Sequence, residues 1–323
     1  MNKTPSIASS PHISAAGSTA TIMLDVLIAL LPAFAASIFY FGLRAALVTG
    51  VCVASCVGFE ALWCLLNKKP LAIKDLSAAV TGVLLAFNLP ASIPLWQAVV
   101  GSLVAIIVIK QLFGGIGCNF VNPALAGRVV MALSFTGAMV NYSYPLRTLT
   151  SASLDALSSA TPLAVLASEE GASSLSALSL FLGEHGGVLG ETSCAALLLG
   201  GIYLCGRGVI KPLIPLCYIG STFIFSWMFG NEHPLLFILS GGLFLGAIFM
   251  ATDYVTSPYT AKGKLIYALG CGLLTALIRM FAGSGSGEGV SYSILLMNLV
   301  VPYINDLTRS KPYGTEVQRN EAR

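Results

Sequence analysis

Charged residues are scarce in this sequence. Asp, Glu, Lys and Arg make up only 10% of its 323 residues, whereas they make up about a quarter of an ordinary soluble domain. Hydrophobic residues account for 56%, and the mean hydropathy is +0.83. The composition therefore excludes a soluble globular domain and indicates a protein that crosses the membrane several times. The net charge of +3 gives little information about partners, and we expect no nucleic-acid binding.

Several common sequence signals are also missing. The first 20 residues are polar and rich in Ser and Ala, without the basic and then apolar pattern of a secretory signal, so we expect a cytoplasmic tail. There is no dinucleotide-binding fingerprint, and no pattern indicates a general base or a nucleophile. The eight cysteines include no C-x-x-C pair. Cys52, Cys56 and Cys64 share a helical face, but scattered cysteines in apolar runs are usually small buried side chains, so we expect no metal site.

Ten apolar runs fill most of the chain. We therefore predict an all-α polytopic membrane protein with about ten transmembrane helices. Several runs are shorter than the roughly 20 residues of a full crossing. Interrupted helices of this kind are tolerated only where protein or a cavity covers the free backbone groups. The predicted spans are 21–41, 45–66, 76–89, 95–110, 123–135, 192–205, 213–229, 235–252, 265–281 and 290–305.

Basic residues predict the orientation of these spans. With the N-terminus inside, only Arg44 and Arg147 lie on the outer side, while Arg128 and Arg279 lie within spans. The other thirteen basic residues lie on the inner side, which is a clear positive-inside bias. Both termini are then cytoplasmic, and the long loop between the fifth and sixth spans is extracytoplasmic. The thirteen are Lys3, Lys68, Lys69, Lys74, Lys110, Arg207, Lys211, Lys262, Lys264, Arg309, Lys311, Arg319 and Arg323.

Polar breaks indicate an internal repeat. The third span ends in a break at 86–90 on the outer side, and the eighth ends in a break at 250–258 on the inner side. Glycine-rich loops precede the fifth span inside and the tenth span outside. An offset of five spans with opposite sidedness predicts two inverted five-span repeats. The predicted organisation is a cytoplasmic tail (1–20), a first transmembrane repeat (21–135), an extracytoplasmic loop (136–191), a second transmembrane repeat (192–305) and a cytoplasmic tail (306–323).

The long loop contains a D-x-x-S-x-A-T string that ends at Thr161. Local chemistry favours a helix start there, with Thr161 as N-cap, Pro162 as the first helical residue and a helix over 163–170. A second interpretation is a threonine hydroxyl among small residues, exposed enough for another enzyme to esterify it with a phosphate-bearing group. The two interpretations are compatible.

A glycine-rich loop before the fifth span is the second informative stretch. Gly114 and Gly115 let backbone amides approach a ligand closely. Asn119 and Asn122 offer paired amide groups, which suit the polar edge of a heteroaromatic ring, and Pro123 can open the next helix. Taken alone, the loop is more simply a re-entrant turn whose asparagines cap a short helix.

Other polar residues lie at the ends of spans. Thr252 and Asp253 belong to the break after the eighth span, where a capped helix end is again the simpler explanation. Asp25 and Glu60 fall near the inner ends of the first two spans. Ionisable groups at membrane depth are costly. Asp25, Glu60 and Asp253 therefore either pair with other charges, such as those of the intramembrane arginines, or mark a cation path, and the residues alone leave both alternatives open.

Taken in order, these stretches resemble a known family. The motifs S-P-H at 10–12 and M-L-D-V-L-I-A-L-L-P at 23–32 are followed by K-Q-L-F-G-G-I-G-x-N-x-x-N-P-A at 110–124. D-A-L-S-S-A-T, L-G-E-T-S, M-A-T-D-x-x-T-S-P and I-L-L-M-N complete the pattern. From about residue 10 to 306, the chain resembles the RnfD family, the D-type subunits of Rnf ion-translocating electron-transport complexes. The related B-type subunits of the sodium-translocating NADH:quinone reductase are longer at the N-terminus, so the Rnf type is favoured.

The resemblance implies an FMN held by a phosphoester on the last threonine of the S-x-A-T motif, here Thr161. The flavin transferase of the family recognises an acidic residue, a Ser or Thr, a small residue and then Ala-Thr. Asp155, Ser158 and Ala160 fit this pattern. Ser159 stands where Gly or Ala is usual, but it is also small.

The resemblance also implies a second flavin, riboflavin or another flavin bound without a covalent bond, among the spans. The asparagine loop looks like part of that site. The residues assigned to the second site are Gly114, Gly115, Asn119, Asn122, Thr252 and Asp253.

The predicted function is that of a flavin-carrying electron carrier without substrate catalysis of its own, in the prokaryotic cell membrane. By resemblance, the complex couples electron transfer between ferredoxin and NAD to Na+ or H+ translocation. Its implied partners are the other Rnf subunits, including a second subunit with covalent flavin, and the flavin transferase. Two alternatives remain, the quinone-reductase subunit and a non-redox transporter built as an inverted repeat.

Overall fold

The computed structural model describes residues 18–70, 73–142, 161–166, 175–281 and 288–309. Helices account for most of these residues, and the described part of the chain contains no β-strand, only one isolated antiparallel bridge between Pro90 and Val188. The prediction of a helical protein is confirmed.

Helices of the first half follow the apolar runs closely. α1 begins after Ser18, whose hydroxyl accepts a bond from the amide of Thr21 and caps the helix. α4 continues without interruption into the π-helical segment η2. The elements are α1 (Thr19–Phe41), α2 (Leu43–Leu66), η1 (Ile73–Asp75), α3 (Ser77–Phe87), α4 (Leu95–Leu103), η2 (Val104–Gln111), α5 (Pro123–Ser134) and α6 (Thr136–Met139).

In the second half, one predicted span is divided. The run 235–252 is interrupted between α11 and α12, where Gly241 takes a left-handed conformation with φ of +70°; α12 then continues directly into the π-helical segment η5. The elements are α7 (Pro162–Leu166), α8 (Ala177–Leu182), α9 (Cys194–Gly206), α10 (Leu213–Met228), α11 (Pro234–Leu239), α12 (Leu243–Leu245), the π-helical η5 (Gly246–Met250), α13 (Ala261–Phe281) and α14 (Gly289–Thr308).

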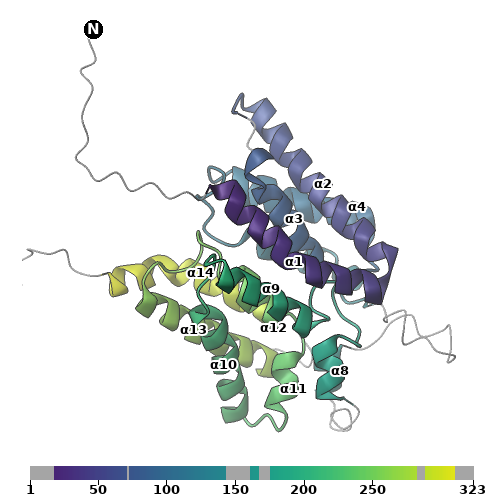
Figure 1. Cartoon of the computed structure of the whole chain (residues 1–323), viewed down its shortest axis with the longest axis vertical. Helices are drawn as coiled ribbons and strands as arrows, with labels where there is room; N and C mark the ends of the chain where they lie inside the picture. Colours follow the sequence, from purple (N-terminus) through teal and green to yellow (C-terminus); the bar gives the residue numbers. More distant parts are fainter. Residues whose placement is uncertain (1–17, 71–72, 143–160, 167–174, 282–287, 310–323) are drawn as a thin grey trace, which may run out of the picture.

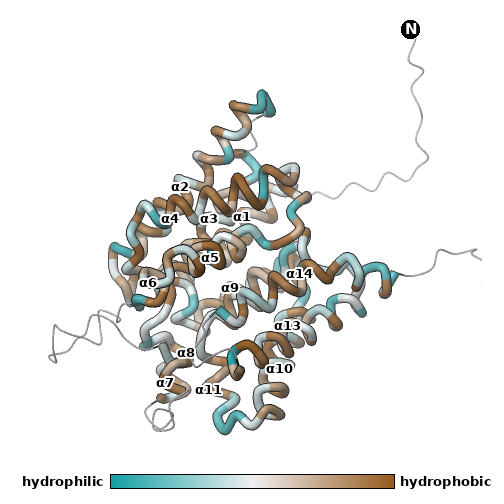
Figure 2. Tube along the Cα trace, turned by 180° about the vertical axis from the view of Figure 1, so that it is seen from behind, coloured by the Kyte–Doolittle hydropathy of each residue, from teal (hydrophilic) through white to brown (hydrophobic). Residues whose placement is uncertain are grey.

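Four of the described helices, α1, α2, α13 and α14, are long and apolar enough to cross a membrane. Shorter apolar helices accompany them. Large apolar side chains such as Leu43, Leu47, Leu199 and Trp227 are exposed, and hydrophobic residues recur along the helices (Figure 2). Exposed apolar surface of this extent is typical of contact with lipid. The chain is a multi-pass membrane protein.

The two halves pack as neighbouring groups of helices (Figure 1). Within the first half, α2 packs on α3 and α4; within the second, α13 packs on α10 and α14. The halves meet where α1 contacts α9 and where α5 contacts α14. Buried apolar residues of both halves form one continuous core, which includes Phe87 and Tyr267.

The segment between α8 and α9 closes the broken end of α3. The amide of Leu189 donates to the carbonyl of Leu89 (3.1 Å), and the amide of Gly190 donates to the carbonyl of Phe87 (2.9 Å). A Cβ atom at position 190 would collide with the Phe87 side chain, so only glycine fits there. A loop of the second half thus satisfies backbone groups that the first half leaves free.

Candidate functional site

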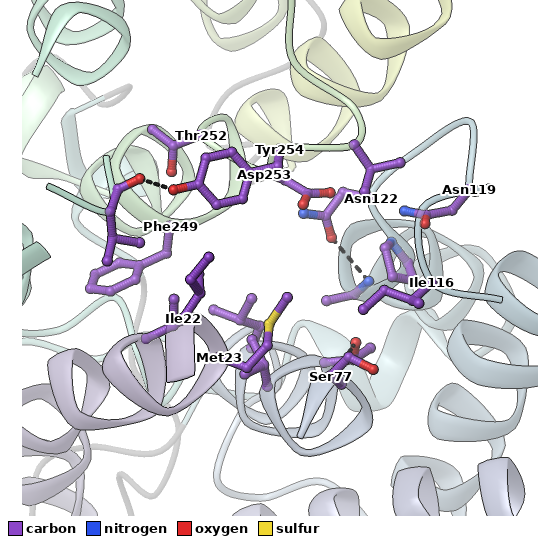
Figure 3. A pocket seen from close by; sticks show the side chains of 18 of the residues that line it. Ile22, Met23, Ser77, Ile116, Asn119, Asn122, Phe249, Thr252, Asp253 and Tyr254 are labelled. Carbon is purple, nitrogen blue, oxygen red and sulfur yellow. Dashed lines mark hydrogen bonds between the residues drawn. The ribbon is translucent and has the colours of Figure 1, made fainter. Parts of the chain in front are cut away.

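A pocket lies between the two halves, at the loop after η2 (Figure 3). We call it the inner pocket. Its walls are mainly apolar and come from α1, α3, α9 and η5, with Met23, Leu84 and Phe249 among the lining residues. A pocket with apolar walls and a few convergent polar groups is the usual form of a small-molecule site.

Four polar residues predicted from separate stretches line this pocket. They are Asn119, Asn122, Thr252 and Asp253. The structure therefore brings the asparagine loop and the break after η5 together at one place (Figure 3). Gly114 and Gly115 do not line the pocket; their φ values of +122° and +97° allow the loop to turn before it reaches Asn119.

Asn122 has a structural role as well. Its Oδ1 atom accepts bonds from the amides of Ala124 (3.1 Å) and Leu125 (3.3 Å), so Asn122 is the N-cap of α5. Its Nδ2 atom donates to the carbonyl of Met250 (3.4 Å) and thereby links the loop to the end of η5. The simpler interpretation, a capping asparagine, is correct for Asn122. Asn119 does not cap a helix; its Nδ2 atom donates to the carbonyl of Val121 (3.3 Å).

The Asp253 carboxylate faces the pocket from the loop after η5 (Figure 3). Its Oδ2 atom accepts a bond from the hydroxyl of Thr256 (3.1 Å). Burial raises the pKa of Asp253, and the bonds from Thr256 and from the amides of Val255 and Tyr254 oppose that rise. The Thr252 hydroxyl donates to the carbonyl of Ile248 (2.6 Å) in η5.

A buried ion pair adjoins the pocket. Lys110 in η2 lines the pocket, and its Nζ atom donates to Glu60 Oε1 (2.7 Å) and to the hydroxyl of Ser77 (2.6 Å). Gln111 Nε2 also donates to Glu60 Oε1 (2.7 Å). From the sequence alone, Lys110 is only one of the basic residues that predict the orientation of the spans, and no pattern connects Lys110 with Glu60. A lysine at the end of an apolar run was the available signal, because charges at membrane depth usually have partners.

The three predicted ion-path residues do not form one cluster. Asp25 pairs with Arg207 (3.3 Å) and accepts a bond from the hydroxyl of Tyr203 (3.0 Å). Glu60 pairs with Lys110, and Asp253 is bonded to Thr256. Of the two alternatives left open by the sequence, a charge pair or a cation path, the structure shows a charge pair for Asp25 and for Glu60.

Thr161 begins a short helix, as its sequence context predicts. Its Oγ1 atom accepts a bond from the amide of Ala164 (3.3 Å), and α7 starts at Pro162. In one respect the prediction was wrong. The second interpretation of the sequence requires an exposed hydroxyl, whereas only 8% of Thr161 is exposed. The motif residues Asp155, Ser158, Ser159 and Ala160 lie outside the described residues.

A charged cluster lies at the broken ends of α3 and α11. We call it the outer cluster; it comprises Arg128, Arg279, Glu191 and Glu288. The guanidinium of Arg128 binds the carboxylate of Glu288 with its Nε and Nη2 atoms (3.0 and 3.2 Å) and donates from Nη1 to Asn88 Oδ1 (2.8 Å). The sequence places Arg128 and Arg279 within spans but does not identify their neighbours.

The other two members of the outer cluster are less well paired. Arg279 donates from Nη1 to the carbonyls of Phe237 and Ser240, at 3.1 Å each. Its Nε and Nη2 atoms are buried without a partner in the described part of the chain, and so is Glu191 Oε2. Burial raises the pKa of Glu191, which lies in the loop before α9, and the charges of Arg128 and Arg279 oppose that rise. Unpaired buried groups of this kind are rare and call for an explanation.

Known proteins similar to this chain match nearly its whole length. The model of the NQR2, RnfD, RnfE family matches residues 6–314. The D-type subunit of a Na(+)-translocating ferredoxin:NAD(+) oxidoreductase complex from Acetobacterium woodii is 49% identical over 98% of each chain. Its counterpart in a proton-translocating ferredoxin:NAD(+) oxidoreductase complex from Clostridium ljungdahlii is 40% identical over 96% of each chain. The counterpart in an ion-translocating oxidoreductase complex from Stutzerimonas stutzeri is 38% identical over 91% of each chain.

Proposed function

Because the chain belongs to the NQR2, RnfD, RnfE family, we propose that it is the D-type subunit of an Rnf-type membrane complex. That complex couples electron transfer between ferredoxin and NAD+ to the translocation of Na+ or H+. The observation that carries this proposal is the 49% identity over 98% of both chains to a relative from a complex of that activity. The experiment that tests it removes the covalent flavin from the assembled complex and measures ferredoxin-dependent NAD+ reduction.

In this proposal the chain holds two flavins and has no substrate catalysis of its own. A bound flavin supplies one- and two-electron redox chemistry that side chains lack. The residues of the chain position the flavins and exclude water, while ferredoxin and NAD+ bind to partner subunits. The other partners are a second subunit with covalent flavin and the flavin transferase that modifies this chain.

The residues around Thr161 fit an FMN joined through a phosphoester. Among the described residues, the Thr161 oxygen accepts one hydrogen bond, from the amide of Ala164, and donates none. An arginine with unpaired N–H groups lies against the same segment. Since Thr161 is buried, the transferase must act before this segment packs against the helices.

The inner pocket fits the ring system of a non-covalent flavin. Its apolar walls suit the faces of a heteroaromatic ring, and the amide of Asn119 and the carboxyl of Asp253 can hydrogen-bond the polar edge. Lys110 and Ser77 also reach this pocket. The pocket residues therefore hold and orient the ring, and no proton transfer is assigned to them.

The Asn119→Leu variant is expected to lose the non-covalent flavin while it keeps the covalent one. Asn119 caps no helix, so the substitution removes a contact to the ring with little effect on the fold. A polar contact left unpaired costs about 1–3 kcal/mol, which corresponds to about 5- to 150-fold weaker binding. The measurement is flavin released by acid from the purified chain.

Asn67→Leu is the matched control for that experiment. Asn67 lies outside the pocket and, like Asn119, donates from Nδ2 to a backbone carbonyl, that of Trp63 (3.0 Å). The control should release as much flavin as the unchanged chain. Equal release from the Asn119 variant would place the second flavin elsewhere.

The proposed topology has ten spans in two inverted repeats. The first repeat consists of α1, α2, α3, α4 with η2, and α5; the second consists of α9, α10, α11 to η5, α13 and α14. The contacts at the two breaks support a two-fold relation. Asn122, the N-cap of α5, reaches Met250 at the break of the second half. Glu288, the N-cap of α14, reaches Asn88 at the break of the first half through Arg128.

The orientation predicts opposite accessibility for two exposed positions. Glu184 follows α8 on the proposed outer side, and Lys262 begins α13 on the inner side. In a chain without its reactive cysteines, Glu184→Cys should react with an impermeant thiol reagent in intact cells. Lys262→Cys should react only after the cells are opened. The reverse pattern would reject the orientation and place Thr161 in the cytoplasm.

A further inference from the structure

Arg279 is held in one orientation by three contacts. Its Nη1 atom donates to the carbonyls of Phe237 and Ser240 at the end of α11. The face of its guanidinium lies over the Phe237 ring, with 5.5 Å between Cζ and the ring centroid. Only 5% of the residue is exposed. The direction in which the remaining N–H groups point is therefore fixed by the fold.

Those remaining groups lie on a single edge of the guanidinium. The Nε and Nη2 atoms share the edge that can bind two oxygens of one anion side by side. In Arg128 this edge binds Glu288, in Arg207 it binds Asp25, and in Arg44 it binds the carbonyls of Ala91 and Ile93. In Arg279 the same edge has no partner among the described residues.

The described acidic neighbours do not fill this edge. Glu191 and Glu288 belong to the same cluster, but Glu288 binds Arg128, and neither carboxylate forms an ion pair with Arg279. The carboxylate of Glu191 lies instead beside Gly242, where a Cβ atom would be 3.3 Å from its Oε2 atom and 3.8 Å from Arg128 Nη1. A buried guanidinium with two free N–H donors can bind an anion, which would accept both hydrogen bonds and compensate the buried positive charge.

The Nη2 atom of this free edge lies close to the segment that begins at Thr161. A Cβ atom built on Gly241 would lie 2.7 Å from Arg279 Nη2 and 2.9 Å from Leu163 Cδ1, so both atoms border the same small space. α7, which carries Leu163, lies next to α11 at this point (Figure 2). Leu163 is two residues from Thr161, a distance of at most about 7 Å along the chain.

We propose that the Nε and Nη2 atoms of Arg279 bind the phosphate of the flavin esterified at Thr161. The inference rests on the proposed covalent flavin and assigns a residue to its recognition. A phosphodiester carries one negative charge and two free oxygens, which match the single charge and the two donors of this edge. Arg279 thus acts as a positioning residue. It anchors the phosphate end of the flavin against α11 and α13.

A stability cycle on the full-length chain tests this proposal. The chain is purified with and without covalent flavin, by expression with and without the flavin transferase, and the thermal midpoint is measured by intrinsic fluorescence. In the unchanged chain, flavin attachment should raise Tm by about 2 °C or more. In Arg279→Lys the charge and a donor to the carbonyls of Phe237 and Ser240 remain, but the two-donor edge is lost. We expect the rise to disappear.

Arg44→Lys is the matched control, because it removes the same two-donor edge where that edge already binds the backbone carbonyls of Ala91 and Ile93. The Arg44→Lys substitution should lower Tm by the same amount with and without covalent flavin. The increase in Tm on flavin attachment should therefore persist in this variant. Should Arg279→Lys fail to fold, Arg279→Gln replaces it in the same cycle. An undiminished rise in the Arg279 variants overturns the assignment of Arg279 and leaves the covalent flavin standing. Absence of any covalent flavin in the unchanged chain overturns the proposed function itself.

Discussion

The Thr161→Val variant is expected to lose all covalent flavin of this chain and still to fold. Valine has nearly the same shape as threonine but no oxygen that can form the phosphoester. The denatured chain should therefore show no flavin fluorescence on a gel, and its mass should lack the increment of one FMN. No other residue is expected to replace Thr161, because the D-x-x-S-x-A-T string ends there.

The structure indicates why the valine variant should still assemble. The Thr161 hydroxyl contributes one cap bond, to the amide of Ala164, and loss of such a cap costs about 0.5–2 kcal/mol. α7 is short and contributes only Pro162 and Leu163 to the buried residues of the chain. The complex should thus form without the covalent flavin. Ferredoxin-dependent NAD+ reduction by that complex should then fall to background.

Thr136→Val is the matched control for the loss of covalent flavin. Thr136 also lies in the region between the repeats, and its hydroxyl bonds the carbonyl of Ala132 (3.0 Å). The control should keep its fluorescence, its mass increment and its activity. Covalent flavin on the Thr161 variant would show that another hydroxyl carries the ester, and the function proposed for the loop would be wrong.

Patterns within single segments carried the successful sequence predictions. Apolar runs located the helices of both halves, because each run is set by its own composition. The Thr-Pro pair at 161–162 located the start of α7, since capping depends on adjacent residues. The link between Asn122 and the break after η5 was also predicted, although 128 residues separate Asn122 from Met250. That prediction came from the family resemblance and not from local chemistry.

Contacts between distant segments could not be derived from the sequence in this way. Nothing in the sequence of Val104–Gln111 indicates a π-helix. The segment is nevertheless π-helical, and it carries Lys110, which binds Glu60. The burial of Thr161 was likewise not predicted, and neither was the position of Leu163 in α7 beside Gly241, a residue far along the chain. The unpaired edge of Arg279 likewise depends on contacts of its Nη1 atom with Phe237 and Ser240, 42 and 39 residues earlier in the chain.

The Lys110→Met variant is expected to be strongly destabilised. Glu60 and Lys110 are 1% and 3% exposed, and their side chains are joined at 2.7 Å. Without Lys110, the Glu60 carboxylate keeps only the bond from Gln111 Nε2 in the described part of the chain. An uncompensated buried charge costs about 3–5 kcal/mol, so the yield of folded protein in gel filtration should fall sharply.

Removal of both partners should largely reverse that loss. An apolar pair of similar volume is often as stable as a buried ion pair, so Glu60→Met combined with Lys110→Met should restore the folded yield, whereas Glu60→Met alone leaves the ammonium unpaired. A double variant as unstable as Lys110→Met would mean that the pair is not the source of the effect. The folded double variant also tests Glu60 as an ion-path residue, because it removes the carboxylate without leaving a charge behind. If the complex still couples ferredoxin oxidation to an ion gradient, Glu60 is a structural partner of Lys110 and the ion path must run elsewhere.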